Sequence, residues 1–234
     1  MNRSHFPILI LNARPAAGKS EIIDYLQRLP PATRLERFHI GAIDVIDDFP
    51  MLWTWFEEDA ILHRMGHPRL HTDAGGYFKE TYFWHLLIER ISLEYEKRLR
   101  DMPDYHATHT TVIEFSRGAE HGGYADAYEH LSETILDRGA SLYVRVSWAE
   151  SLRKNRARFN PDRPDSILEH GLSDEKMRRL YREDDWDEWT ADDPAYLHVG
   201  QQRVPYAVFE NEDDVTTGPG AALDKRLTAA LATL

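Results

Sequence analysis

The chain of 234 residues is 42% hydrophobic and 29% charged, which is typical of globular proteins and excludes a disordered tail protein, a collagen and a coiled coil. Its 28 Lys and Arg against 40 Asp and Glu give a formal net charge of −12. That charge argues against nucleic-acid binding through the whole surface, although a local basic pocket for phosphates stays open. The absence of cysteine excludes disulfides, thiolate metal sites and thiol catalysis.

The first apolar run of the sequence, residues 6–11, predicts a strand that is buried on both faces. This run is far shorter than the roughly 20 residues that a membrane-spanning helix needs. No secretory signal pattern surrounds it. We therefore expect a soluble, cytoplasmic protein with no membrane partner and no nucleic-acid partner.

A helix is predicted directly after this strand and a turn, because Ile22, Ile23, Leu26 and Leu29 share one helical face before Pro30. Further strands are predicted at 38–43, 110–115, 142–146 and 206–210, and further helices at 51–65, 77–99, 122–136, 150–158, 174–189 and 221–231.

This alternation of strands and helices indicates an α/β fold, in which a parallel sheet is covered by helices on both faces. We predict one domain over 1–234 with two mostly helical insertions, 44–109 and 149–200. Both insertions are expected at the carboxyl edge of the sheet, where such folds bind ligands. The helix 77–99 either covers its own sheet or packs on a second copy, so a homodimer stays open.

The turn after the first strand carries the one specific motif, Ala-Arg-Pro-Ala-Ala-Gly-Lys-Ser at 13–20. It matches the phosphate-binding pattern G-x-x-x-x-G-K-[ST], with Ala13 in place of the first glycine. Backbone amides of such a loop surround an anion, and the helix N-terminus adds a positive field. Lys19 is predicted to contact the β- and γ-phosphates and Ser20 to bind Mg²⁺. The predicted nucleotide-binding residues are Ala13, Arg14, Pro15, Ala16, Ala17, Gly18, Lys19, Ser20 and Glu21.

Through this strand, loop and helix the chain resembles the P-loop kinases of the nucleoside and nucleotide kinase type. The resemblance implies a three-layer P-loop NTPase fold with a five-stranded parallel sheet of order 2-3-1-4-5, ATP as phosphoryl donor, Mg²⁺ and a mobile lid. It makes 44–109 the acceptor-binding insertion and 149–200 the lid-type insertion. Only the loop is a specific motif, and the other parts match by their order along the chain.

The end of the third predicted strand reads Val-Ile-Glu-Phe-Ser-Arg-Gly at 112–118. The resemblance places an acidic residue and an arginine here, although deoxynucleoside kinases have Glu-Arg-Ser where this chain has Glu-Phe-Ser-Arg. Glu114 would then serve Mg²⁺ together with Ser20. Arg117 would bind an acceptor phosphate or the transferring group. The alternative is an exposed ion pair at a strand end.

Carboxylates follow the second predicted strand, and kinases that phosphorylate a hydroxyl often keep a general base near this position. Asp44 is our first candidate for this base and Asp47 the second, because proton transfer typically contributes 10²- to 10⁴-fold in rate. The alternative is helix capping, since Asp48 precedes a predicted helix.

A basic segment lies in the second insertion of this otherwise acidic chain. The resemblance assigns it to a lid that stabilises charge on the phosphates, with Arg153 and Arg156 as the catalytic candidates. The alternative is a solvated helix face that pairs with the acidic stretch 184–193. By helical spacing, Arg153 and Arg156 share one face of the helix, and Lys154 and Arg158 share another. The basic residues are Arg153, Lys154, Arg156, Arg158 and Arg163.

Three weaker patterns each have two interpretations. Asn211 follows the fifth predicted strand, where related kinases surround the adenine, or it belongs to a plain loop. Aromatic residues of the first insertion would stack on a base or sugar, or pack as a core. The histidines His63, His67 and His71 have helical spacing, but Pro68 interrupts it, which favours solvent-facing side chains over a metal site. The motif Asp-Ala-Gly-Gly at 73–76 lacks the context of a GTPase.

Together these features predict an ATP-dependent kinase of a small molecule, with Lys19, Asp44, Glu114, Arg117, Arg153 and Arg156 as catalytic candidates. The acceptor is left open among nucleosides, nucleotides, sugars and antibiotics. An alternative is a nucleotide-binding regulator or slow NTPase without a small-molecule acceptor. A third is a sulfo- or other group transferase, which the metal-competent Ser20 argues against.

Overall fold

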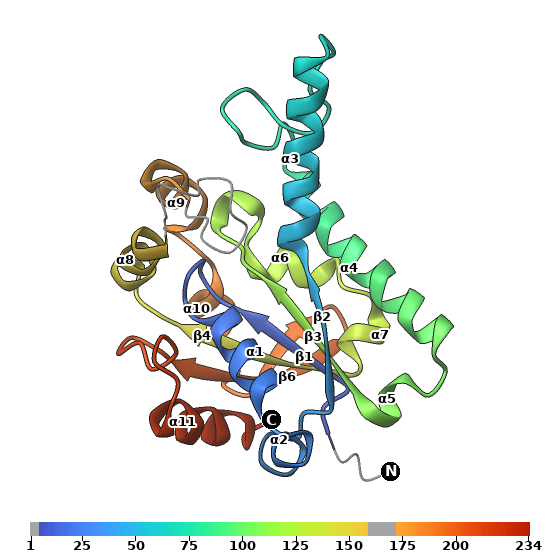
Figure 1. Ribbon diagram of the computed structural model, residues 1–234, viewed down its shortest axis with the longest axis vertical. Coiled ribbons are helices and arrows are strands. Elements are labelled where there is room, and N and C mark those ends of the chain that lie inside the picture. The colour runs from blue at the N-terminus through green and yellow to red at the C-terminus, as the bar shows by residue number, and fades with distance from the viewer. Residues whose placement is uncertain (1–4, 159–171) are drawn as a thin grey trace.

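The computed structural model describes residues 5–158 and 172–234 (Figure 1). Within them lies a mixed α/β arrangement around a sheet of six strands in the order β2-β3-β1-β4-β6-β5. Five strands are parallel, and β5 pairs antiparallel with β6 at the sheet edge. The strands are β1 (Ile8–Asn12), β2 (Ala42–Asp47), β3 (His109–Phe115), β4 (Gly139–Arg145), β5 (Tyr196–Val199) and β6 (Gln202–Glu210).

The number and order of strands therefore differ from the predicted five-stranded sheet of order 2-3-1-4-5. The difference is one added edge strand, β5, whose four residues alternate between exposed and buried. The first half of β6 was not predicted because it contains Pro205. Proline has no backbone N–H to donate, so it is unexpected in a strand that pairs on both sides. Here Pro205 pairs only with Tyr196 of β5, and pairing with β4 begins at Tyr206.

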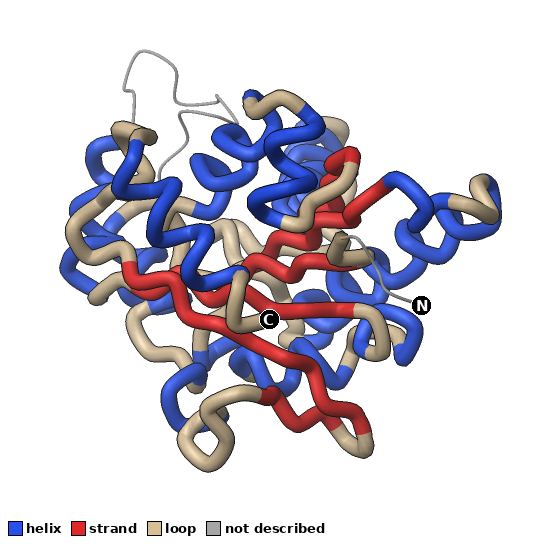
Figure 2. Tube along the Cα trace, turned by 90° about the horizontal axis from the view of Figure 1, so that it is seen from below, coloured by secondary structure: helices blue, strands red, loops and turns tan. Residues whose placement is uncertain are grey.

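The central strand β1 is buried throughout, and its side chains alternate between two cores. Leu9 and Leu11 pack in the core under α1 (Lys19–Arg28), α2 (Pro31–Phe38) and α11 (Ala221–Leu231). Ile8 and Ile10 pack on the other face. The helices there are α4 (Tyr82–Asp101), α5 (Tyr105–Thr108), α6 (Gly123–Glu129), α7 (Glu133–Leu136) and α10 (Trp186–Trp189). Figure 2 shows the strands between these two layers of helices.

The remaining helices lie around the carboxyl ends of the parallel strands. α3 (Asp48–Arg64) begins where β2 ends and rises away from the sheet (Figure 1). A 3₁₀ turn, η1 (Ala119–His121), follows β3, and α8 (Trp148–Arg158) and α9 (Asp174–Tyr181) follow β4. In the described ranges, no helix is long and apolar enough to cross a membrane.

The far part of α3 is fixed to the loop that follows it by Asp59. Its fully buried carboxylate accepts hydrogen bonds from the backbone amides of Leu70, His71 and Thr72, and from the Thr72 hydroxyl. Beside it the Trp55 ring stacks on His71 at 5.1 Å. Many aromatic residues of this insertion therefore pack on one another as a core.

Candidate functional site

The predicted phosphate loop joins β1 to α1 in the conformation that anion-binding loops need. Ala16 and Gly18 have positive φ angles of 58° and 114°. A Cβ on Gly18 would lie 2.5 Å from Thr216 Oγ1 and 2.8 Å from Asn211 Nδ2, so only glycine fits. Alternation of right- and left-handed residues turns successive amides toward one point, which suits an anion.

Asn211 braces this loop from behind. Its buried side-chain amide donates to the Ala17 carbonyl at 2.8 Å and to Thr216 Oγ1 at 2.8 Å. Lys154 of α8 contacts the same Thr216 at 3.2 Å. The adenine role expected for Asn211 stays a prediction, and the observed contacts of its side chain hold the loop in shape.

Lys19 and Ser20 point from the start of α1 toward the end of β3. Lys19 Nζ donates to Ser116 Oγ at 2.7 Å and lies 3.8 Å from Glu114 Oε1. Ser20 Oγ donates to the same Glu114 oxygen at 3.3 Å. Burial lowers the pKa of Lys19, while the charges of Glu114 and Asp47 oppose that shift.

Carboxylates from two neighbouring strands meet beside Lys19. Asp47 ends β2 directly opposite Glu114 on β3, and Asp48 follows it. Burial, together with the charges of Glu114 and Asp48, raises the pKa of Asp47 to about 8. Burial also raises the pKa of Glu114, against the influence of Lys19. Negative charge therefore accumulates here with little compensation.

Arg117 compensates Asp48 alone. Its buried guanidinium donates to Asp48 Oδ2 at 2.6 Å, to the Ser116 carbonyl at 2.7 Å and to the Trp84 carbonyl at 3.2 Å. These contacts make a buried ion pair rather than the exposed pair that the sequence left as an alternative. Arg117 lines the cavity described next, with its donors engaged by the protein.

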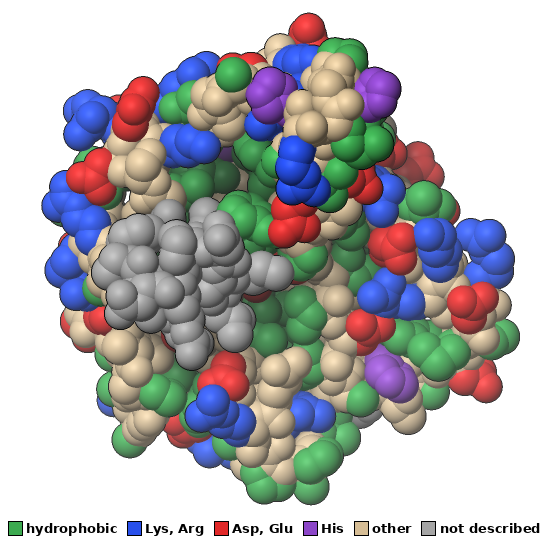
Figure 3. Space-filling model, turned by 45° about the horizontal axis from the view of Figure 1, so that its top comes forward, with side chains coloured by type: hydrophobic (Ala, Val, Ile, Leu, Met, Phe, Trp, Pro, Cys, Tyr) green, Lys and Arg blue, Asp and Glu red, His purple; other side chains and the backbone are tan. Residues whose placement is uncertain are grey.

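A cavity of about 730 Å³ joins the loop to the aromatic insertion. This volume lies within the range of ligand-binding pockets. Its lining includes Pro15, Ala16, Lys19 and Ser20 of the loop together with the carboxylates Asp47, Asp48 and Glu114. Figure 3 shows hydrophobic side chains gathered at the middle of this face, with charged side chains around them. Aromatic residues of the first insertion also line it, namely Phe49, Trp53, Phe56, Tyr77, Phe78 and Trp84.

Arg153 and Arg156, the two residues of the basic segment predicted as catalytic, do not line the cavity. Arg153 is exposed and pairs with Glu150 and Asp214. Arg156 is exposed and pairs with Asp174. Arg158, from the face that Lys154 shares, lines the cavity and lies 3.5 Å from Glu21. Lys176 and Arg179 of α9 also line it. Arg163 lies outside the described residues.

The structure does not bring Asp44 to the cavity, which corrects its choice as first candidate for the base. It lies three residues before the end of β2, about 10 Å along the strand from Asp47 by the usual rise. Its carboxylate accepts from Arg98 at 2.6 Å and from the Tyr105 hydroxyl at 2.8 Å. Asp47, the second candidate, lines the cavity.

Arg14 also has its side chain turned away from the cavity. Its guanidinium donates to the carbonyls of Tyr181 at 3.3 Å and Arg182 at 3.2 Å, and it pairs with Asp184 at 2.9 Å. The Pro15 carbonyl accepts from Ser151 Oγ at 2.8 Å. These contacts tie the loop to the segments around α8 and α9, and within 13–15 it is Pro15 that lines the cavity.

Ser116 was not among the predicted site residues, although its position two residues after Glu114 could have indicated it. Side chains two residues apart on a strand point the same way, so a candidate Glu114 implies Ser116 beside it. Lys176 and Arg179 had no such signal, because they approach the cavity from a helix more than fifty residues further along the chain.

Comparisons with known proteins give little beyond this geometry. No family model and no curated protein matches the chain. A solved structure of TT1252 from Thermus thermophilus is similar with a TM-score of 0.46 and 17% identity over 98% of both chains. The structure of APE1195 has a TM-score of 0.42 and 14% sequence identity, and the match covers 97% of this chain and 98% of that one. A shikimate kinase from Acinetobacter baumannii, in complex with shikimate, has a TM-score of 0.36 and 14% sequence identity. The match covers 74% of this chain and 71% of that one. Likenesses this weak carry no functional argument.

Proposed function

We propose that this protein is a kinase that transfers the γ-phosphoryl group of Mg·ATP to a hydroxyl of a small molecule. The observation that carries the proposal is the junction of the 13–20 loop with the end of β3. There a left-handed Gly18 precedes Lys19 and Ser20, whose side chains contact Ser116 and Glu114 inside the cavity.

The loop would hold the donor phosphates. Its amides and the N-terminus of α1 favour an anion, and Lys19 would turn from Ser116 to the β- and γ-phosphates. Arg158 adds a cation from α8 at the same wall of the cavity. Preorganised positive charge at the transferring phosphoryl oxygens is the main source of rate enhancement in such reactions.

The donor set at the strand ends fits Mg²⁺, which prefers oxygen ligands and keeps several waters. Ser20 and Glu114 would hold the ion, directly or through water, with Asp47 beside them. Arg117 is bound to Asp48, and the cations that act on Glu114 are Lys19 and Arg158, of which Lys19 also acts on Asp47. A bound Mg²⁺ would supply the missing charge and neutralise the phosphates.

Asp47 is our candidate for the general base. The acceptor oxygen would form a bond to the γ-phosphorus, the bond to the β-phosphate oxygen would break, and the hydroxyl proton would pass to Asp47. ADP and the phosphorylated acceptor are then the products. A base is most effective when its pKa lies near the working pH, and the raised pKa of Asp47 satisfies this condition.

The acceptor would occupy the part of the cavity that the aromatic residues line. The rings of Phe49 and Trp53 stack at 5.9 Å, and Trp84 also lines the cavity. Such surfaces favour an acceptor with a planar or apolar part. Lys176 and Arg179, both next to the Tyr77 ring, would suit a negative group on it.

The test is ATP consumption over a panel of hydroxyl-bearing acceptors: nucleosides, nucleotides, sugars and antibiotics. We expect slow hydrolysis alone and faster consumption with one acceptor class. Lys19→Ala should lower that turnover a hundredfold or more, the loss typical of removing a preorganised charge partner. Lys97→Ala, which removes an exposed lysine paired with Glu94, is the matched control.

Unchanged turnover in Lys19→Ala would contradict the proposal. Nucleotide binding without dependence on any acceptor would favour the alternative of a regulator or slow NTPase. Binding of a sulfonucleotide in place of ATP would favour a sulfotransferase.

A further inference from the structure

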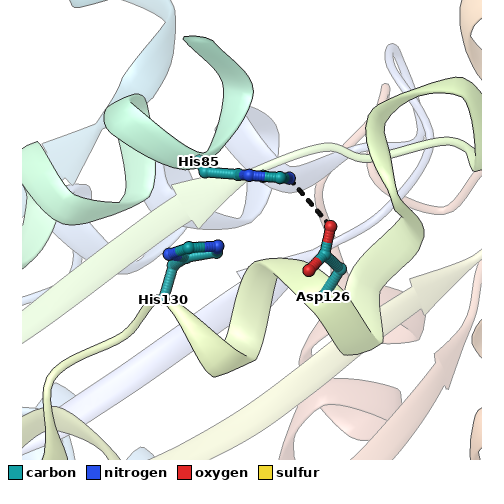
Figure 4. Close-up of side chains that lie close together, drawn as sticks. All are labelled: His85, Asp126 and His130. Carbon is teal, nitrogen blue, oxygen red and sulfur yellow. Dashed lines mark ion pairs between the residues drawn. The ribbon is translucent and has the colours of Figure 1, made fainter. Parts of the chain in front are cut away.

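Two histidines and an aspartate converge where α4 meets α6, apart from the cavity. His85 lies on α4, Asp126 on α6, and His130 at the end of α6 (Figure 4). One potential ligand atom from each lies within 4.8 Å of the other two. All three side chains are partly buried, and none lines the cavity of the proposed kinase site.

The Nε2 atom of His85 forms an ion-pair contact with Asp126, which Figure 4 marks, but no aligned hydrogen bond. This atom is buried and has no hydrogen-bond partner among the described residues, although Asp126 Oδ2 is 2.8 Å away. That oxygen is near the nitrogen without being aligned for a proton between them. A cation placed on the lone pair of Nε2 and beside the carboxylate would satisfy both groups.

His130 is held in the orientation that a ligand needs. Its Nδ1 lies 3.1 Å from Glu89 Oε1, a carboxylate oxygen that can only accept, so Nδ1–H donates and the neutral imidazole has its lone pair on Nε2. Metal-binding histidines commonly have such a carboxylate on the second nitrogen. The two imidazole rings stack with centroids 4.4 Å apart and planes 15° apart. Figure 4 shows them lying parallel beside Asp126.

We propose that His85, Asp126 and His130 bind a divalent transition-metal ion such as Zn²⁺, with Glu89 orienting His130. Two imidazoles and one carboxylate are typical ligands of Zn²⁺ and similar ions, whereas Mg²⁺ and Ca²⁺ take oxygen donors. A shared metal ion would use a lone pair from each of the two imidazoles.

The ion would cross-link α4 and α6 next to the cavity wall. Trp84, the residue before His85, lines the cavity, and its ring stacks on His121 at 3.8 Å. The Trp84 carbonyl also accepts from Arg117. Metal binding would therefore hold the wall that Trp84 forms. This inference stands on its own contacts and does not depend on the kinase proposal.

The test titrates the metal-stripped full chain with Zn²⁺ by calorimetry and with Co²⁺ by visible absorption, both in excess Mg²⁺ to occupy oxygen-donor sites. We expect one ion per chain, a Co²⁺ spectrum of nitrogen and oxygen ligation, and a rise in Tm. His130→Gln and Asp126→Asn should weaken binding tenfold or more. Glu89→Gln should weaken it about 10- to 100-fold, as loss of a supporting carboxylate does.

His198→Gln is the matched control, because it removes an exposed histidine that pairs with Asp193 at 2.8 Å. It should leave the affinity unchanged. His130 lies at the partly exposed end of its helix, so its variant keeps the test valid if a His85 variant fails to fold. No stoichiometric binding to the wild type, or equal binding by the His130 and Asp126 variants, would overturn the proposal.

Discussion

Asp47, the N-cap of α3, and Asp59, in the second half of that helix, are both withdrawn from water, but their pKa values shift in opposite directions. Burial acts to raise the pKa of Asp59, but hydrogen bonds from Leu70, Thr72 and His71 outweigh it and leave that pKa below its usual range. Burial and then the two carboxylate neighbours raise the pKa of Asp47, the N-cap of the helix, and its one amide donor, Phe49, does not offset them.

This comparison separates a structural carboxylate from a candidate functional one. The charge of Asp59 is satisfied by donors that the fold supplies. The charge of Asp47 is left for a ligand, a cation or a proton to satisfy. Perturbed groups of the second kind gather at functional sites, because only there is uncompensated charge useful.

The largest expected effect is loss of stability at Asp59. Asp59→Ala would leave three backbone amides and the Thr72 hydroxyl without their acceptor, and each buried unsatisfied group costs about 1–3 kcal/mol. Water that enters the space left by the carboxylate would satisfy some of these groups. We therefore expect the free energy of unfolding, measured with urea, to fall by about 4 kcal/mol. A loss below about 1 kcal/mol would mean that this carboxylate does not hold the insertion together.

The second effect is loss of turnover at Asp47. Asp47→Asn keeps the helix cap but removes the base, so we expect kcat to fall about a hundredfold with the fold intact. Asp44→Asn is the control, because Asp44 is bound to Arg98 and Tyr105 outside the cavity. Equal losses in both variants would remove the distinction between these aspartates.

A smaller effect separates the arginines of α8. Arg158→Ala should lower kcat/KM about tenfold, by losing one partly exposed charge near the phosphates. Arg153→Ala should change it less than twofold, because Arg153 pairs with Glu150 away from the cavity. Assays of the two variants side by side check this expectation, and a larger loss in Arg153→Ala would reverse the assignment.

The smallest effect is a difference in how stability depends on pH. The folded-state pKa of Asp47 is raised, so its contribution favours folding at low pH and is lost as the pH rises toward about 8. Asp47→Asn mimics the protonated acid. Its Tm should match the wild type below about pH 4, where the acid is protonated in both the folded and the unfolded state, and exceed it by at least ~2 °C at pH 8. A constant difference across this range would contradict the shifted pKa.

The loop and the strands around it were predictable because they are determined by residues that are close together in the sequence. An apolar run, a Gly-Lys-Ser turn and an amphipathic helix fall within thirty residues. The choice between Asp44 and Asp47 was not predictable, since it depends on where β2 ends. The choice between Arg153 and Arg158 depends on which face of α8 turns inward.

Long-range clusters left no local pattern at all. His85 and Asp126 are far apart in the sequence and meet only because α4 packs on α6. The histidines at 63, 67 and 71 have helical spacing but do not belong to this cluster, and His71 stacks on Trp55. The added strand β5 was missed because it is short and follows a stretch read as helical.

The most direct test of the central claim is a thermal-shift titration with ATP, GTP, ADP and a sulfonucleotide, with and without Mg²⁺, on the wild type and Lys19→Ala. A ligand at a hundred times its dissociation constant adds about 2.7 kcal/mol, or roughly 5–10 °C in Tm for a chain of this size. We predict a Mg²⁺-dependent shift with ATP that Lys19→Ala loses. No shift with any nucleotide would contradict the account, because the loop at 13–20 would then not bind phosphate.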